Sequence, residues 1–492
     1  MLDETAQIIG RNIDFLPLKT YTSIVEGNAL RIDWNSLLPS GECSYIMSNP
    51  PFLGYSNQER WQKDDILYVY SDEQGRPYKS AGKLDYVAGW YFKAAEYMKG
   101  TKAATAFVST NSITQGEQAA AVWEALYERF GLEIIFAWRT FVWNNEAAEM
   151  AHVHCVIVGF CCDKAMAAKK AKAIYIPKKQ VAARQPDVPE PFEGEKADVI
   201  SPYLTASKPV FIKPRSKPIR SVPEMTAGGK PAEGGNLIMS AGEKDELLNG
   251  YPEAALFIRP FLMGKDFIDR KPRYCLWLVG ADAGVLRRIP PIAGRIAKVR
   301  EFRLASKKPA TARKAATPML FEEIKECASN YVAMPQVSSE RRDYVPVDWL
   351  PKDVIAGNML FMVEDAGLYE FGILTSSVHM AWMRAVAGRL KSDYRYSNTV
   401  VYNNFIWPEP DPSVKQKIEK SAQQVLEARK LYPESSFADL YDPLFMPPEL
   451  QKAHQANDKA VLEAYGLKAG TPEDRIVACL FSLYGQKAKK QA

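Results

Sequence analysis

The first third of the chain alternates between short apolar runs and longer stretches with apolar residues at helical spacing. Each apolar run has the length of a β-strand and ends in turn-forming residues. This alternation is typical of a sheet whose strands are joined by helices, so we expect an α/β fold with a parallel-type sheet. The last run is almost continuously apolar, as a strand covered on both faces would be, and we expect it to finish the sheet as an antiparallel strand. The expected strands cover residues 24–25, 45–47, 104–108, 132–138 and 152–161, and the expected helices cover residues 85–99 and 118–130.

The pattern changes after residue 165. Residues 165–179 are rich in alanine and lysine and residues 185–191 are rich in proline, so a linker or domain edge is expected near 165–200. Beyond it, short strands mix with helices, and the tail is helical. The helices expected there lie near 293–306, at 378–390, and at 414–432, 448–465 and 473–486. We therefore expect three parts, an α/β domain at 1–170, a mixed α+β domain at 171–405 and a helical region at 406–492.

Length and composition limit the class of protein. At 492 residues the chain is too long for one compact core, so two or three domains are expected. Hydrophobic residues make up 47% and charged residues 25%, as in an ordinary globular protein. No apolar stretch has the length of a bilayer span, and the seven cysteines lack a disulfide-framework spacing, which favours a protein of the reducing cytoplasm with no membrane contact. His152, His154 and Cys155 lack the further ligands of a tetrahedral zinc site, so no metal is expected.

The most informative short segment is Asn49-Pro50-Pro51-Phe52, directly after the expected strand at 45–47. The prolines fix φ and remove two backbone donors, so this loop cannot fold back into the sheet. It presents an amide, bare carbonyls and an aromatic ring at the carboxyl end of a strand, where α/β sheets bind ligands. An exocyclic amine of a flipped base needs two acceptors and a stacking surface, and this loop offers both. The tetrapeptide resembles the catalytic loop of methyltransferases that modify adenine N6 in DNA, and a structural turn is the alternative.

Asn28 is the candidate cofactor contact. It ends the segment Glu26-Gly27-Asn28, which follows the first expected strand, one strand before the Asn-Pro-Pro loop. In class I methyltransferases the equivalent strand end carries an acid or amide that binds the adenine of S-adenosylmethionine. A simple Gly-Asn turn is the alternative.

Positive charge is concentrated between Arg287 and Lys314. Ten basic residues and a single acid, Glu301, lie in this interval, a distribution suited to the phosphate backbone of DNA. A solvated helix face is the alternative. The candidate DNA contacts here are Arg295, Lys298, Arg300 and Arg303.

Longer segments resemble the MmeI-like class of combined restriction–modification enzymes, which belong to the type IIL/IIG DNA methyltransferases. The matching segments together extend from about residue 15 to residue 465, and those between 374 and 405 are the most specific. The segments lie at 15–21, 26–30, 48–54, 110–113, 258–262, 337–342, 374–383, 389–397 and 401–405.

The resemblance implies a partial Rossmann-like methyltransferase sheet that depends on S-adenosylmethionine, followed by a target-recognition domain and a helical tail. It implies N6 methylation of adenine in double-stranded DNA by base flipping, within a restriction–modification or phage-defence system. In the recognition domain, basic and polar side chains would contact phosphates and base edges. The candidates are Ser338, Ser339, Arg341 and Arg342, for which surface salt bridges are the alternative.

The chain also departs from this family. The glycine-rich cofactor loop, the nuclease domain and a helical spacer should lie well before the Asn-Pro-Pro strand, but only 48 residues precede Asn49. We therefore expect a truncated or split protein that needs an upstream partner chain. A sheet without its first strands would expose an edge and apolar faces, so residues 1–110 are expected to be unstable alone. A non-catalytic DNA-binding specificity module is the alternative function, and cytosine N4 methylation is less favoured because those enzymes more often have serine at the first position of the loop.

Overall fold

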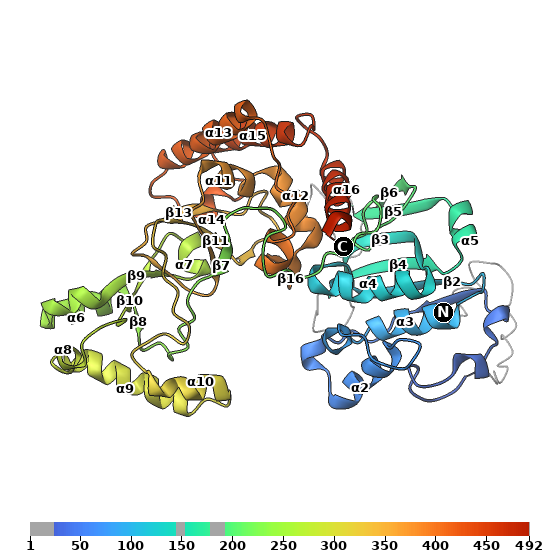
Figure 1. Cartoon of the computed structure of the whole chain (residues 1–492), viewed down its shortest axis with the longest axis horizontal. Helices are drawn as coiled ribbons and strands as arrows, with labels where there is room; N and C mark the ends of the chain where they lie inside the picture. Colours follow the sequence, from blue (N-terminus) through green and yellow to red (C-terminus); the bar gives the residue numbers. More distant parts are fainter. Residues whose placement is uncertain (1–23, 144–152, 178–191, 492) are drawn as a thin grey trace, which may run out of the picture.

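One six-stranded sheet organises the amino-terminal part of the chain in the computed structural model, which describes residues 24–143, 153–177 and 192–491 (Figure 1). Its strand order is β1-β2-β4-β3-β5-β6. β1 is parallel to β2 and β3 is parallel to β5, whereas β4 runs antiparallel between β2 and β3. The antiparallel direction expected for 152–161 is thus confirmed in β4. The expectation that this strand finishes the sheet is wrong, because β4 lies between β2 and β3, and β5 and β6 follow it along the chain. The strands are β1 Tyr45–Ser48, β2 Ala104–Thr110, β3 Glu133–Trp143, β4 Val153–Cys161, β5 Lys172–Pro177 and β6 Phe192–Ala197.

Three helices cover one face of this sheet, namely α2 Arg60–Val69, α3 Ala88–Tyr97 and α4 Gly116–Phe130, and the expected helices at 85–99 and 118–130 are thereby confirmed. Aromatic side chains fill the layer between them. Tyr91 of α3 stacks on Phe160 of β4 with ring centroids 5.4 Å apart, and Trp123 of α4 meets Tyr91 edge-on. This buried aromatic layer fixes the positions of β1 and β2 relative to α3 and α4.

Two further expectations about this sheet are wrong. Ile24 and Val25 form no strand and are largely exposed, since a run of two apolar residues has no neighbouring strand to pair with there. Conversely, β5 and β6 lie within the interval expected to be a linker, so the sheet continues past residue 170 to Ala197. The alanine- and lysine-rich composition suggested a linker, but the segment forms a short helix, α5 Lys164–Lys169, followed by the strand β5.

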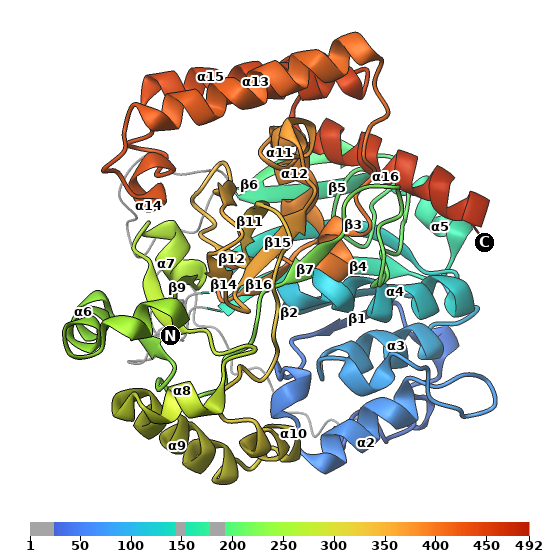
Figure 2. The same cartoon turned by 60° about the vertical axis from the view of Figure 1, so that its left-hand side comes forward.

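The middle of the chain contains three small sheets with helices around them (Figure 2). The basic segment expected near 293–306 is the helix α9, and the helix expected at 378–390 is α12 followed by a short strand, β16. The strands are β7 Met225–Ala227, β8 Ile238–Met239, β9 Ile258–Leu262, β10 Arg273–Leu276, β11 Tyr331–Pro335, β12 Val337–Ser338, β13 Asp348–Leu350, β14 Ile355–Ala356, β15 Leu360–Glu364, β16 Gly388–Leu390 and β17 Asp393–Arg395. The helices are α6 Ala241–Gly250, α7 Gly264–Ile268, α8 Ala283–Arg287, α9 Pro290–Leu304, α10 Pro309–Arg313, α11 Leu368–Leu374 and α12 Ser377–Val386.

The tail forms the expected helices, which are α13 Pro412–Lys430, α15 Pro448–Ala464 and α16 Glu473–Gln491, with the short α14 Phe437–Leu440 between them (Figure 1). They do not form a separate core. Trp382 of α12 packs edge-on against Phe481 of α16, and one continuous hydrophobic cluster joins residues 203 to 484. Among the described residues, no helix is long and apolar enough to cross a membrane.

Candidate functional site

The Asn49-Pro50-Pro51-Phe52 loop leaves the sheet at the carboxyl end of β1. Because β1 and β2 are parallel, this end lies beside the carboxyl end of β2. Asn49 is exposed, and its side chain makes no hydrogen bond within the described part of the chain. Pro50 is buried, whereas Phe52 is half-buried against the aromatic core. Pro50 and Phe52 thus anchor the loop, while the amide of Asn49 stays exposed.

Asp85, just before α3, fixes the residues that follow this loop. Its carboxylate accepts a hydrogen bond from the backbone N–H of Tyr55 at 3.0 Å and one from the hydroxyl of Ser112 at 2.6 Å. The carbonyl of Leu53 accepts a further bond from the backbone N–H of Tyr86 at 2.9 Å. Since Ser112 follows β2, the Asp85 carboxylate holds together the segments that leave two neighbouring strands. Sequence reasoning missed Asp85 because no spacing relates it to the loop.

Asn28, the candidate cofactor contact, lies beside a buried carboxylate. Its amide nitrogen donates to Asp65 at 2.7 Å, and the same carboxylate accepts from Arg31 Nε at 2.6 Å and from the Tyr86 hydroxyl at 2.9 Å. Burial by itself would raise the pKa of Asp65, but the hydrogen bonds from Arg31, Asn28 and Tyr86, with the charge of Arg31, lower it overall. Asn28 Oδ1 also accepts the backbone N–H of Leu30 at 3.0 Å.

These bonds give Asn28 a structural role. An asparagine amide can make four hydrogen bonds, and two of them are used here within the chain. A contact with S-adenosylmethionine would have to use the remaining hydrogen and lone pair, and it stays a prediction.

The described residues do not enclose a site for S-adenosylmethionine. β1 is the edge strand of the sheet, with no strand on its outer side among the described residues. Ile46 packs inward against the α3 core, whereas Tyr45 and Met47 on the opposite face of β1 are 73% and 83% exposed. The wall of a cofactor pocket beyond β1 would therefore have to come from residues other than these.

The basic interval divides into exposed and buried side chains. Lys298 and Arg300 of α9 are exposed, whereas Arg295 donates to the carbonyl of Asn236 and pairs with Glu243 at 2.8 Å. For Arg303, the expectation of a contact with DNA is wrong. Arg303 is fully buried, and its guanidinium donates five hydrogen bonds, all to backbone carbonyls.

Arg303 therefore holds the chain around α9 together and has no surface to offer to DNA. The five acceptors are the carbonyls of Pro231, Ala232, Lys314, Thr317 and Leu320. Desolvation lowers the pKa of this guanidinium even though the charges of Glu322 and Glu233 favour its protonated form.

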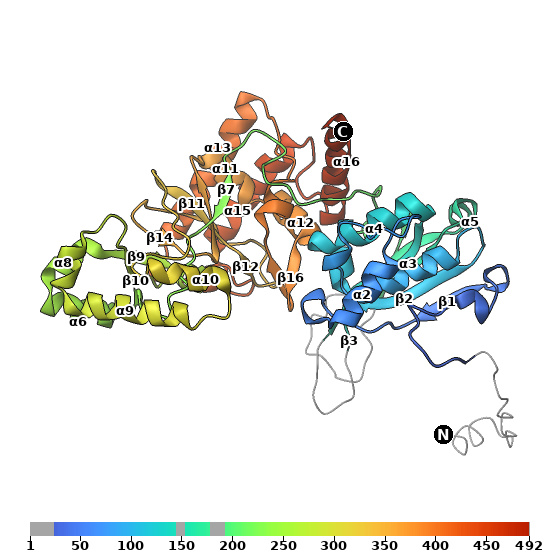
Figure 3. The same ribbon diagram turned by 60° about the horizontal axis from the view of Figure 1, so that its bottom comes forward.

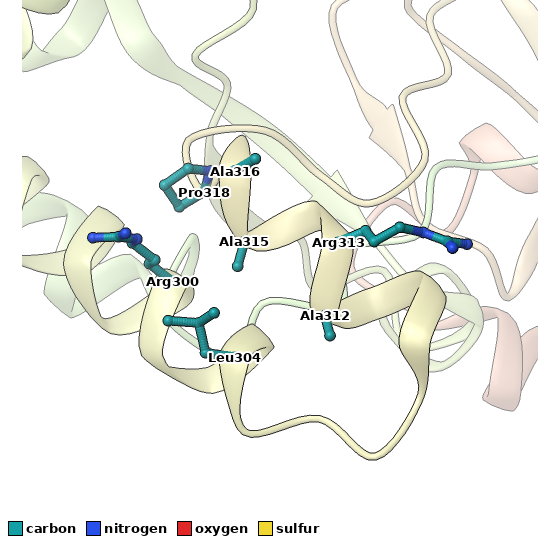
Figure 4. Close-up of a pocket in the computed structure, with 7 residues that line it drawn as sticks. All are labelled: Arg300, Leu304, Ala312, Arg313, Ala315, Ala316 and Pro318. Atoms are coloured by element: carbon teal, nitrogen blue, oxygen red, sulfur yellow. The ribbon is translucent and has the colours of Figure 1, made fainter.

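A shallow pocket of about 540 Å³ lies between α9 and the segment 312–318 (Figure 4). Its lining is mainly apolar, with Leu304 on one side and three alanines on the other. The two arginines at its margin, Arg300 and Arg313, extend away from one another. The pocket is therefore a gap between helices, and the exposed cations around it form a surface rather than an enclosed anion site.

The second group of candidate DNA contacts lies on and after β12. Ser338 is buried, and its hydroxyl has no hydrogen-bond partner within the described chain, so direct contact between this side chain and DNA is not supported. Ser339 and Arg342 are partly exposed, and Arg341 is exposed with Asp442 at 3.7 Å. Burial lowers the pKa of Arg342, which is flanked by carboxylates. No cluster of three or more His, Cys, Asp or Glu side chains suited to a metal ion occurs among the described residues.

Comparison with known proteins matches almost the whole chain to three domains of one family. Residues 2–176 match the DNA-methyltransferase domain of MmeI, residues 206–409 match its target recognition domain, and residues 410–491 match its C-terminal domain. DNA methyltransferase A of Bacillus subtilis (strain 168) is 35% identical over 477 residues, which is 96% of this chain and 52% of the relative. This chain therefore spans about half the length of that relative.

A solved structure agrees with these matches. The structure of the type IIL restriction-modification enzyme MmeI in complex with DNA is 40% identical and superposes with a TM-score of 0.86, covering 99% of this chain and 63% of that one. The sequence-based family assignment is thus confirmed. The chain belongs to the MmeI family, whose methyltransferase, target recognition and C-terminal domains follow one another along it.

Proposed function

We propose that this chain holds the target base and recognises the DNA site in an enzyme that methylates adenine N6 of double-stranded DNA after base flipping. It would act in the cytoplasm within a restriction–modification or phage-defence system. The observation that carries the proposal is the Asn49 side chain, exposed at the carboxyl end of β1 without a hydrogen bond inside the described chain, on a loop fixed by Asp85. A purely structural turn would be expected to satisfy this amide within the protein.

Asn49 and the carbonyl of Pro50 would accept the two hydrogens of the adenine amine, while the partly exposed face of Phe52 would stack on the ring. Two acceptors fix the orientation of the nitrogen, and positioning of this kind supplies much of the rate of a displacement reaction. S-adenosylmethionine, when bound, would supply the methyl group. Because the described residues do not enclose that cofactor, the function derived for this chain is to bind and orient the base.

The missing wall would be an amino-terminal methyltransferase half that carries the glycine-rich loop, either covalently linked to this chain or as a separate partner. The open edge of β1 and the exposed Tyr45 and Met47 support this arrangement. A strand added there would pair the free backbone groups of β1, and an element packed on that face would cover Tyr45 and Met47; both features are otherwise an aggregation hazard. The lack of an enclosed cofactor site among the described residues is what favours the alternative function, a specificity module that binds a DNA site without methylating it.

The test uses tritiated S-adenosylmethionine and plasmid DNA, with this chain alone and with the amino-terminal half of a close family member supplied in trans. Label in N6-methyladenine only when both are present is the expected result, and Asn49→Ala should abolish it. Label from this chain alone would refute the need for a partner half. Site-specific DNA binding with no label under either condition would refute the enzyme and favour the specificity module.

A further inference from the structure

The strands β16 and β17 form a tight hairpin with an apolar residue at its tip. Leu390 pairs with Asp393, which leaves Lys391 and Ser392 as a two-residue turn. Lys391 has a φ of +57°, a conformation that a non-glycine residue rarely adopts. Leu390 is 50% exposed, whereas Tyr394 in the middle of β17 is buried. The positive φ of Lys391 and the exposure of Leu390 are both unfavourable in free energy for the isolated chain. Backbone strain of this kind is often kept at functional sites.

The hairpin is rigidly attached to the recognition domain. The Arg389 guanidinium lies 3.7 Å from the ring centre of the buried Tyr394, and it donates to the carbonyl of Ser392 at 2.7 Å. β12 pairs with β17 on the other side, with Ser338 opposite Tyr394. The tip is therefore supported by a three-stranded sheet that also carries the proposed recognition residues after β12.

The hairpin also touches the start of α4 in the methyltransferase domain. A Cβ atom added to Gly116 at the start of α4 would lie 3.3 Å from the Cα of Gly388, so the two backbones are nearly in contact. Gly116 follows the segment after β2 that includes Ser112, and Ser112 shares the Asp85 carboxylate with the loop of Asn49. Figure 3 shows β16 beside α4, between the recognition region and the methyltransferase sheet.

The charge on the hairpin suits a nucleic acid. Lys391 and Arg395 are exposed, and Arg389 adds a third cation. The acids that face it are Glu340, whose carboxylate lies 3.7 Å from Arg389, and Asp393, which accepts the backbone N–H of Glu340 at 3.3 Å. Cations around an apolar tip are the combination found where proteins insert a side chain between DNA bases.

We propose that this hairpin is a wedge, and that Leu390 enters the duplex to fill the space left when the target adenine rotates toward Asn49. The inference rests on the proposed function. A flipped base leaves its neighbours unstacked and its partner unpaired, and an apolar side chain in that space lowers the free energy of the flipped state. Leu390 would thus be a positioning residue, which acts on the base-flipping equilibrium and not on the reacting atoms.

The test uses this chain with the amino-terminal half described above, and a duplex whose target adenine has been located by sequencing of methylated DNA. Replacing that adenine with 2-aminopurine gives a fluorescence signal for flipping, and fluorescence anisotropy gives the dissociation constant. The methylation rate is measured on the adenine duplex, because 2-aminopurine lacks the N6 amine. Leu390→Ala should lower the flipping signal and the methylation rate about tenfold, as expected when most of a leucine side chain that becomes buried in the duplex is removed. Leu390→Met should restore most of both. Leu431→Ala removes another leucine that is 63% exposed, outside the hairpin, and should change neither.

A duplex with a mispaired target adenine tests whether Leu390 acts as a wedge or only stabilises the protein. The mismatch already weakens pairing, so the defect of Leu390→Ala should shrink to about twofold or less on that duplex. A defect of equal size on paired and mispaired DNA, or no defect at all, would overturn the wedge while leaving the proposed function intact. Absence of flipping and methylation by the unsubstituted protein would instead overturn the proposed function itself.

Discussion

Replacing Arg303 with methionine should destabilise the basic region instead of simply weakening its affinity for DNA. Methionine fills a similar volume but donates no hydrogen bonds, so five backbone carbonyls would lose their donor. An unsatisfied buried polar group costs about 1–3 kcal/mol, and hydrogen bonds to a charged group are at the strong end of the range. Relief of guanidinium burial offsets part of this loss, and water can reach the acceptors nearer the surface. A net loss of roughly 3 kcal/mol or more in the free energy of unfolding is expected.

Arg300 provides the matched control, since it lies one turn earlier on α9 and is exposed. Arg300→Met should change the free energy of unfolding by less than about 0.5 kcal/mol, as surface substitutions usually do, while weakening DNA binding. Urea unfolding can be followed by tryptophan fluorescence, to which Trp277 in the same hydrophobic cluster as α9 contributes, with DNA affinity measured by anisotropy. The reasoning is refuted if Arg303→Met has the stability of the unsubstituted protein and loses as much DNA affinity as Arg300→Met.

Three further predictions follow from the exposure and charge of single side chains. Asn49→Ala should leave the urea midpoint unchanged because the side chain is exposed and makes no hydrogen bond within the described chain, and a clear drop in stability would show that the loop is structural. Lys308→Gln should reduce the slope of log affinity against log salt by about 0.9 if this exposed lysine contacts one phosphate, and an unchanged slope measured by anisotropy would remove it from the interface. Complete burial lowers the pKa of His379 from 6.5 to about 3, so between these values the unfolded chain binds a proton that the folded chain does not. The free energy of unfolding should therefore fall as the pH is lowered from 7 toward 3, and this histidine should account for about 2 kcal/mol of the fall at pH 5. Urea unfolding at pH 7 and pH 5 should show a smaller fall for His379→Gln than for the unsubstituted protein.

The sequence predicted the elements whose formation depends on local chemistry. The prolines of the Asn49 loop end β1 wherever that strand lies, and the apolar spacing of the tail is helical without reference to its partners. The antiparallel β4 was also predicted, because a strand covered on both faces is apolar along its whole length. Composition gave a wrong expectation in the alanine- and lysine-rich interval, which contains α5 and β5 and is not a linker.

The sequence by itself determined the Asn-Pro-Pro loop and the concentration of positive charge, since both are properties of adjacent residues. Only the tertiary structure decided which of those charges is available. Arg300 and Arg303 are three residues apart on one helix, and the carbonyls that surround the second come partly from residues 231–232, about seventy positions away. Two other contacts also join residues that are far apart in the sequence. Asp85 accepts a hydrogen bond from Ser112, and Gly388 lies against Gly116. Burial is a property of what packs against a residue, so long-range packing had to be known before the buried structural cations could be separated from the exposed ones.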